Sequence, residues 1–380
     1  MLQANITSMP MFVCAVFTAL LWLDLRHRPE RYLLAVFFSV TTLLYLGHCI
    51  FFNPATLFIP LSDTIYAYCN VAVNPLYYIY IASLTTSQPT LRAPRLWFPL
   101  LPTFVCGTAI GVLYLLMSHK ETEQFLETYL YGAHHAPLDG LAWWQAVAHD
   151  AAKVVFALQI LPVVMVGLRH IRRFNHAVEE NYADTEGRSL RTLGTLLWLF
   201  LLTSLTSFAS NVVGRQWFGT SLWLLAIPSV AFTVLLFCIG RTGLRQNFSI
   251  LDLQEEEQKT AAPEEEKTAV AEKTKDDGTT TWQQRIVNRI VDEQLFLRPD
   301  LKLDELARQL GTNRTYLSQA INEVTHLSFS DFINSRRIAW GEQLKAEHPD
   351  MSVNDIMHKC GFASYSSFHR NWLRFKQAQR

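Results

Sequence analysis

Histidine, aspartate and lysine side chains gather in one short stretch of the chain. His149, Asp150 and Lys153 lie within five residues of one another, and His134 and His135 precede them. Imidazole and carboxylate groups can bind a metal ion or titrate near neutral pH. Their spacing here matches no standard metal motif. We therefore expect no metal and no other cofactor, and a metal or pH sensor at this stretch stays open as the alternative.

Other polar side chains lie inside apolar runs, where an unsatisfied polar group is costly. They are His48, Asn70, Asn74, Gln159 and Asn211. Such side chains commonly form hydrogen bonds between membrane helices, and we favour this interpretation. The alternative is that they line a cavity for a small ligand.

No pattern of residues indicates catalysis. The sequence contains no Gly-rich phosphate loop, no Ser/His/Asp arrangement typical of hydrolases and no His-Glu-x-x-His motif. The last long apolar run, residues 221–240, has no lysine that could form the Schiff base of a retinal-type pigment. We therefore expect that the protein is not an enzyme.

Long apolar segments must position these side chains. Half of the 380 residues are hydrophobic and 17% are charged, which is too apolar for an ordinary cytosolic protein. Runs long enough to cross a bilayer as helices lie at about residues 9–25, 31–52, 65–84, 96–117, 146–168, 193–211 and 221–240. The sequence therefore predicts a bundle of seven membrane-spanning helices.

Arginines mark one side of this predicted bundle. Lys and Arg gather on the cytoplasmic side of membrane proteins. Here they follow the first, third, fifth and seventh runs, as Arg92 and Arg95 do after the third and Arg241 and Arg245 after the seventh. The other connections are nearly bare of them, and residues 53–64 hold none. The pattern predicts an N-terminus outside the cytoplasm and a C-terminal region inside it.

The composition changes after the seventh run. Residues 252–281 hold 10 Asp and Glu against 4 Lys and Arg, and few apolar residues. Such a segment cannot bury enough surface to fold alone. We expect residues 247–281 to be a disordered, charged tether.

Two helix-turn-helix patterns follow the tether. Each has apolar residues at helical spacing on both sides of a glycine, Gly311 in the first pattern and Gly361 in the second. This arrangement predicts two short helices packed at an angle. Ser352 and Asp355 form a Ser-x-x-Asp capping box at the start of the second pattern.

A long amphipathic helix is predicted between the two patterns. Ser328 and Asp331 form a capping box at its start. Its inward stripe is predicted to hold Phe332, Ile333, Ile338, Ala339 and Leu344, while the side chains predicted to point elsewhere are Arg336, Arg337 and Lys345. Such a helix would hold the two patterns at a fixed separation.

This C-terminal region contains the stretches LKLDELARQLGTNRTYLSQAIN, SFSDFINSRRIAWGEQL and SVNDIMHKCGFASYSSFHRNW. Together they resemble the DNA-binding domain of the AraC/XylS family of bacterial transcription regulators. The most specific part is Gly361-Phe362-x-Ser364-x-Ser366-x-Phe368-x-Arg370. The resemblance implies that the second helix of each pattern binds the major groove, and that the two helices occupy successive grooves on one face of the duplex.

The resemblance also implies which side chains contact DNA. Residues near the start of a helix in the major groove face base edges and phosphates. Arginine can bind guanine, glutamine can bind adenine, and serine or threonine can hold a phosphate. The implied contacts are Arg314, Thr315, Ser318 and Gln319 in the first unit and Tyr365, Ser366, Ser367, His369 and Arg370 in the second. The alternative for Arg314 and Arg370 is that they contact only phosphates or form surface ion pairs.

The chain departs from the family pattern at three points. Lys302 stands where the family has a Ser or Thr cap, Met357 replaces a small residue at the helix crossing, and the chain reaches Arg380 without a Gly-x-Ser-Pro-x-x-Tyr run. These departures keep a second interpretation open. In it, the chain is a membrane receptor or transporter-like protein whose helix-turn-helix domain binds another protein.

We interpret the chain as an all-α, membrane-anchored, one-component transcription regulator of the bacterial inner membrane. Residues 1–246 are predicted to form a seven-span, sensor-like domain, residues 247–281 the tether, and residues 282–380 the DNA-binding domain. The expected partners are double-stranded DNA, the lipid bilayer, a small-molecule or protein signal, and a second copy of the chain in a homodimer.

Overall fold

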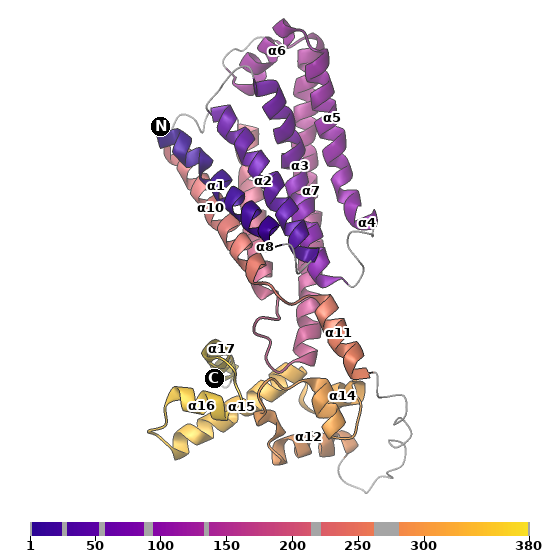
Figure 1. Cartoon of the computed structure of the whole chain (residues 1–380), viewed down its shortest axis with the longest axis vertical. Coiled ribbons are helices and arrows are strands. Elements are labelled where there is room, and N and C mark those ends of the chain that lie inside the picture. The colour runs from indigo at the N-terminus through magenta and orange to yellow at the C-terminus, as the bar shows by residue number, and fades with distance from the viewer. Residues whose placement is uncertain are drawn as a thin grey trace. The chain divides into compact units, whose positions relative to one another are not determined.

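Helices make up the regular structure of the chain. The computed structural model describes residues 2–24, 29–52, 58–86, 94–132, 137–213, 222–261 and 281–378. Within these residues the only β-type pairing is one isolated bridge, between Tyr182 and Lys302, so the predicted all-α class is confirmed. The chain forms two compact units, Met1–Ile171 with Leu190–Asn247 and Arg172–Ser189 with Phe248–Arg380 (Figure 1).

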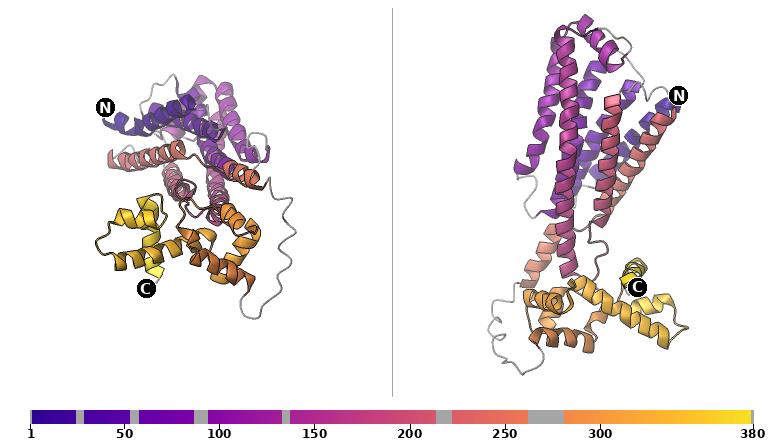
Figure 2. Two further views of the ribbon diagram at one scale, coloured as in Figure 1. Left: turned by 60° about the horizontal axis from the view of Figure 1, so that its bottom comes forward. Right: turned by 180° about the vertical axis from the view of Figure 1, so that it is seen from behind.

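The first unit is a bundle of long helices, which Figure 2 shows from two further sides. Its elements are α1 (Leu2–Leu23), α2 (Pro29–Phe52), α3 (Ile59–Thr85), α4 (Pro94–Trp97), η4 (Phe98–Leu100), α5 (Leu101–Leu116), α6 (His119–Phe125), η5 (Leu126–Leu130), most of α7 (Gly140–Asn181), α8 (Arg191–Val213) and α10 (Leu222–Arg245). Within the unit, α1 packs against α2 and α10, and α3 packs against α2 and α5. A glycine permits the close approach of α5 to α3, because a Cβ at Gly107 would come within 2.4 Å of the Tyr68 ring.

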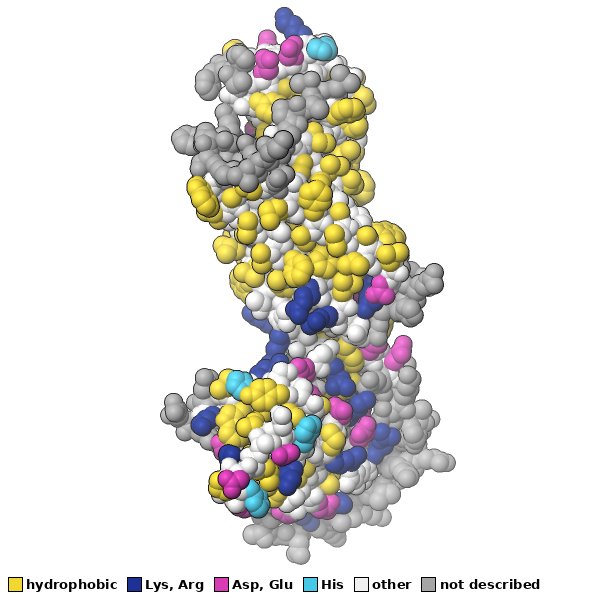
Figure 3. All heavy atoms as spheres, turned by 60° about the vertical axis from the view of Figure 1, so that its left-hand side comes forward, with side chains coloured by type: hydrophobic (Ala, Val, Ile, Leu, Met, Phe, Trp, Pro, Cys, Tyr) yellow, Lys and Arg dark blue, Asp and Glu magenta, His cyan; other side chains and the backbone are white. Residues whose placement is uncertain are grey.

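Six helices among the described residues are long and apolar enough to cross a membrane. They are α1, α2, α5 with the residues just before it, α7, α8 and α10. Hydrophobic side chains cover much of this unit on the face shown in Figure 3, and Leu115 and Leu23 are 87% and 80% exposed. Large contiguous apolar surface is rare on proteins that are surrounded by water. The outer surface of the bundle is therefore compatible with a membrane anchor.

The third predicted span is helical but differs from these six. α3 covers residues 65–84 as predicted, and most of its side chains are buried inside the bundle. It carries Asp63, Asn70 and Asn74 among its apolar residues, and it does not reach the apolarity of the six. Asp63 and Asn74 are 7% and 1% exposed, so α3 places polar groups inside the unit.

The fifth predicted span, residues 146–168, is part of a much longer helix. α7 is continuous over 42 residues, which corresponds to about 63 Å at ~1.5 Å per residue, roughly twice the ~30 Å hydrocarbon core of a bilayer. Its last turns continue because residues 169–181 contain no Gly or Pro that would end the helix. From Arg172 onward, α7 belongs to the second unit.

The second unit contains the two predicted helix-turn-helix motifs. Besides the end of α7, its elements are α11 (Ile250–Ala261), α12 (Trp282–Asp292), η7 (Leu295–Leu297), α13 (Leu303–Gln309), α14 (Arg314–Thr325), α15 (Phe329–Glu347), α16 (Val353–Lys359) and α17 (Tyr365–Ala378). α13 and α14 form the first motif, α16 and α17 form the second, and α15 connects them. Ser328 and Ser352 cap α15 and α16 as predicted, because their hydroxyls accept hydrogen bonds from backbone N–H groups. Lys302 makes no such bond at the start of α13.

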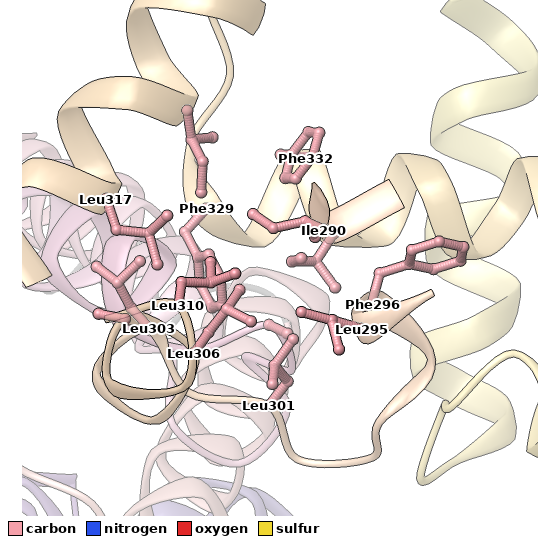
Figure 4. Packing of buried hydrophobic residues seen from close by; sticks show 14 of the residues in the cluster. Ile290, Leu295, Phe296, Leu301, Leu303, Leu306, Leu310, Leu317, Phe329 and Phe332 are labelled. Atoms are coloured by element: carbon pink, nitrogen blue, oxygen red, sulfur yellow. The ribbon is translucent and has the colours of Figure 1, made fainter. Parts of the chain in front are cut away.

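Each motif packs on a hydrophobic core. The first core, shown in Figure 4, includes Leu306, Leu317 and Phe332 and joins α12, η7, α13, α14 and α15. The second core includes Met357 and Phe368 and joins α15, α16 and α17. Because α15 contributes to both cores, it holds the two motifs together.

Two side chains of α15 differ from the predicted stripe. Phe332, Ile333, Ile338 and Leu344 are buried as predicted, but Ala339 is exposed and Arg337 is fully buried. Arg337 follows Ile333 by four residues, and side chains at this spacing share one face of a helix. The prediction that Arg337 points away was therefore wrong, because it followed residue polarity and not position on the helix.

The predicted tether has structure at its start. α11 covers residues 250–261, within the stretch 247–281 whose composition predicts disorder. Leu253 of α11 is 3% exposed, so the helix packs on neighbouring residues. The rest of the stretch, residues 262–280, lies outside the described residues.

Gly311 and Gly361 allow a matched test of the two turns. Their φ angles are +71° and +79°, and a left-handed backbone costs other residues roughly 1–2 kcal/mol. A Cβ at Gly361 would also lie 2.2 Å from the carbonyl oxygen of Leu297, whereas a Cβ at Gly311 meets nothing within 4 Å. We expect Gly361→Ala to loosen the second motif much more than Gly311→Ala loosens the first. Hydrogen exchange of the two motifs in the full-length protein measures this, and equal loss of protection would contradict the expectation.

Candidate functional site

The first motif presents its predicted DNA contacts on α14. Thr315 and Gln319 are exposed, and Arg314 and Ser318 are half-buried at the same end of the helix. Arg314 is held toward α13, where its Nε lies 4.0 Å from Oδ1 of Asp304. The opposite face of α14 is anchored in the first core by buried apolar side chains. The structure thus brings these four predicted residues together on one exposed helix end.

The second motif presents its predicted contacts on α17, with one exception. Tyr365, Ser366, His369 and Arg370 are exposed, and the rings of Tyr365 and His369 stack with centroids 5.7 Å apart. Ser367 differs because it is 2% exposed. The structure therefore places Ser367 on the inner side of α17, apart from the other four.

A segment that is distant in sequence lies against the start of α17. Residues 182–188, named here the 182–188 segment, follow α7 directly. Glu186 of this segment accepts hydrogen bonds from the hydroxyls of Ser364 and Ser366, and its Oε2 lies 3.7 Å from Nη2 of Arg370. No local pattern signals this contact, because Glu186 and Ser366 are 180 positions apart along the chain.

The charge on Glu186 is stabilised by these neighbours. Partial burial of the carboxylate favours its neutral form, but the hydrogen bonds from Ser364 and Ser366 and the positive charge of Arg370 outweigh this effect. The pKa of Glu186 is therefore lowered. The carboxylate is ionised at neutral pH, and the contact with α17 weakens only in acid, as the pH falls through this lowered pKa.

Arg337 fixes the position of the second motif from inside. Its Nε donates a 2.7 Å hydrogen bond to the carbonyl oxygen of Phe296, and its Nη2 donates to the carbonyl oxygen of Arg298. Its guanidinium carbon lies 5.4 Å from the centre of the Phe362 ring, next to the turn of the second motif. Burial lowers the pKa of Arg337 to about 10, so the side chain keeps its charge at neutral pH.

Comparisons with known proteins identify the C-terminal region. Residues 306–378 match the family described as helix-turn-helix domain. An uncharacterized HTH-type transcriptional regulator of Staphylococcus aureus (strain MSSA476) is 32% identical over 90 residues, which are 23% of this chain and 12% of that relative. The uncharacterized HTH-type transcriptional regulator YtdP of Bacillus subtilis (strain 168) is 34% identical over 77 residues, or 20% of this chain and 10% of that relative. No solved structure matches the chain.

These matches confirm the resemblance for the C-terminal region. The second unit contains a helix-turn-helix DNA-binding domain of the kind that transcriptional regulators carry. The matched stretch spans about an eighth or less of each of these curated relatives.

The cluster near His149 forms local contacts within the bundle. His149 Nε2 lies 2.7 Å from Oδ2 of Asp63, and Lys153 Nζ donates a 3.0 Å hydrogen bond to Asp150. His134 and His135 lie outside the described residues. Among the described residues, no group of three His, Cys, Asp or Glu side chains is placed to hold a metal ion.

The bundle contains a second candidate site, a cavity of about 140 Å³. Of the polar residues expected inside apolar runs, His48, Asn70 and Asn74 line it. Gln159 instead donates a 3.1 Å hydrogen bond to the carbonyl oxygen of Pro99, and the side chain of Asn211 lies outside the described part of the structure. The described residues that line the cavity include no Lys, Arg, Asp or Glu.

Asn74 is the most unusual side chain in this lining. It is 1% exposed, and neither its amide nitrogen nor its amide oxygen has a hydrogen-bond partner among the described residues. A buried amide without partners costs about 1–3 kcal/mol of stability. A ligand that entered the cavity is one partner that could satisfy this amide.

Asn74→Leu and Asp63→Leu separate the cavity interpretation from the packing interpretation. Leucine at position 74 removes an unpaired amide, so we expect a melting temperature of the detergent-purified protein that is unchanged or raised. Asp63 accepts a 2.8 Å hydrogen bond from Tyr114 and pairs with His149, so Asp63→Leu is expected to destabilise the bundle by about 1–3 kcal/mol. If Asn74→Leu destabilises the bundle as much as Asp63→Leu, then Asn74 serves packing.

Proposed function

We propose that this chain is a membrane-anchored, one-component transcription regulator of the AraC type. In this proposal the second unit binds specific DNA sequences in the cytoplasm, alone or as a homodimer, and the helical bundle holds it at the inner membrane of a bacterium. A signal that the bundle senses controls DNA binding. The observation that carries the proposal is the helix-turn-helix match over residues 306–378 in a chain with six helices apolar enough to cross a bilayer.

The arrangement of α14 and α17 supports DNA binding by both motifs. Each helix is the second of its motif, and each presents polar side chains at its N-terminal end, where helices in the major groove contact bases and phosphates. Arg314 and Gln319 of α14 have the donors that read guanine and adenine. Tyr365, Ser366, His369 and Arg370 are the corresponding exposed group on α17. Residues 282–380 hold 14 Lys and Arg against 11 Asp and Glu, so local placement of these donors matters more than net charge.

The cavity supports the proposed sensing role. Its lining combines aromatic and aliphatic residues with the neutral polar groups of Asn70, Asn74 and Ser229. A lining whose described residues include His48 but no Lys, Arg, Asp or Glu favours an uncharged ligand, because a charged group would lose its hydration without a permanently charged partner. The ligand class that fits is a small apolar molecule with one neutral hydrogen-bonding group.

DNA binding is tested on the full-length protein in lipid nanodiscs with chromosomal DNA fragments at two salt concentrations. We expect affinity to fall steeply with salt, because phosphate contacts release counterions. Arg314→Ala should weaken binding and reduce the salt slope by about 1 if Arg314 contacts a phosphate. Arg289→Ala is the control, because Arg289 of α12 pairs with Glu293, the residue that caps the C-terminus of the same helix. Binding that is absent or independent of salt would favour the protein-interaction alternative, for which Lys302 and Met357 are the motivating departures.

The orientation is tested with a reporter that is active only in the cytoplasm. Arginines follow alternate apolar helices, and such residues stay on the cytoplasmic side. A fusion after Thr242 is therefore expected to be active and a fusion after Glu123 inactive. The reverse result would overturn the proposed orientation, and with it the access of the second unit to DNA.

A further inference from the structure

The 182–188 segment is anchored on the DNA-binding domain by its backbone. The N–H of Ala183 donates a 3.0 Å hydrogen bond to the carbonyl oxygen of Leu301, within the bridge between Tyr182 and Lys302. The carbonyl oxygen of Ala183 accepts hydrogen bonds from Ser330 at 3.0 Å and Asn334 at 2.8 Å. Ala183 is fully buried, as a member of the first core.

These hydrogen bonds involve two polar side chains of α15, Ser330 and Asn334, that are buried inside the domain. Ser330 and Asn334 are polar side chains of α15 that are 4% and 3% exposed, and buried polar groups need partners. The Ala183 carbonyl oxygen of the segment accepts from the Ser330 hydroxyl and from the Asn334 amide nitrogen, while the Asn334 amide oxygen has no partner among the described residues. Lys302, which does not cap α13, gives its backbone to the bridge, and its ammonium lies 5.7 Å from the centre of the Tyr182 ring. The contact is therefore built into the domain and is not a chance meeting of surfaces.

From this anchor the segment places the carboxylates of Asp184 and Glu186 against the start of α17. Asp184 Oδ1 accepts hydrogen bonds from the hydroxyl of Ser367 at 3.1 Å and from the N–H of Glu186 at 3.0 Å. This turn places Glu186 between the hydroxyls of Ser364 and Ser366 and the guanidinium of Arg370. Ser366, Ser367 and Arg370 are three of the five side chains predicted to bind DNA in the second motif.

The chemistry of this contact is that of a bound phosphate. Hydroxyls, an arginine and the N-terminus of a helix are the donors with which proteins hold DNA phosphates, and α17 is a helix of 14 residues. In this structure a carboxylate takes those donors. One anion satisfies them at a time, because a phosphate beside Glu186 would be repelled by its charge.

We propose that the 182–188 segment competes with DNA for the second helix-turn-helix motif, with Glu186 in the place of a backbone phosphate. The inference rests on the proposed DNA-binding function and adds its regulation. While the segment is docked, α17 does not bind the duplex. The domain reaches its full affinity only after the segment leaves, so the apparent dissociation constant is the intrinsic one divided by the undocked fraction.

The test compares Glu186→Gln with wild-type full-length protein in lipid nanodiscs. Glutamine keeps the shape of the side chain and removes its charge, so the contact weakens and the donors of α17 become accessible. The probe is a labelled duplex of mixed sequence. We expect its affinity to rise roughly tenfold, which is the gain if the undocked state is populated at about one tenth in the wild type and becomes dominant in the variant.

Glu180→Gln is the matched control. It removes the same charge from α7, where Glu180 lies 3.4 Å from Nδ1 of His176. Its affinity is expected to change by about twofold or less, because one exposed charge acts only through a screened field. An equal rise in both variants would overturn the proposed competition and leave the DNA-binding function standing.

Hydrogen exchange provides a second, independent outcome. Adding the duplex to wild-type protein should speed exchange in residues 182–188, Ala183 included, because the segment is displaced, while the part of the first core that α13 and α14 contribute stays protected. Binding of the duplex without any change in this segment would also overturn the competition. If neither wild type nor Glu186→Gln binds the duplex at low salt, the proposed DNA-binding function fails, and the inference that rests on it fails too.

Discussion

A charged guanidinium can be buried only if the protein supplies its hydrogen bonds, because the loss of hydration is otherwise too costly. Arg337 meets this constraint with two of its three nitrogens: Nε and Nη2 donate to the backbone carbonyl oxygens of Phe296 and Arg298, while Nη1 is buried without a partner among the described residues. Those carbonyls belong to the turn that precedes the first motif, while the ring of Phe362 beside the guanidinium belongs to the second. The relative position of α14 and α17, the two helices proposed to contact DNA, therefore depends on one side chain of α15.

Features that depend on neighbours in sequence could be predicted. The two motifs, the capping by Ser328 and Ser352, and the helices over all seven apolar runs follow from periodicity and local hydrogen bonding. The predicted contact residues of α14 and α17 came from the family resemblance, and all of them except Ser367 are exposed or half-buried. Arg337 was missed because the prediction followed its polarity, although it lies four residues after the buried Ile333 and therefore on the same face of the helix.

Features that depend on distant residues could not be predicted. Ser367 is a polar residue at a helix start, which suits DNA contact, yet its partner Asp184 lies 183 positions earlier. The length of α7 was also missed. The prediction stopped where the apolar run stops, at residue 168, whereas the helix continues to Asn181. In the bundle, apolarity alone identifies the outer helices as membrane spans but identifies α3 less clearly. The reason is that α3 carries the buried polar residues Asp63 and Asn74, which contact other helices or the cavity.

Placing the 182–188 segment and α17 in one chain has a consequence for gene dosage. An intramolecular partner acts at an effective concentration that its tether sets and that does not depend on how many copies the cell makes. Each additional copy of the protein brings one 182–188 segment and one α17, so overproduction alone does not change the docked fraction. A regulator built in this way would keep the DNA-competent fraction of its copies set by the state of its own bundle, whatever its level of expression.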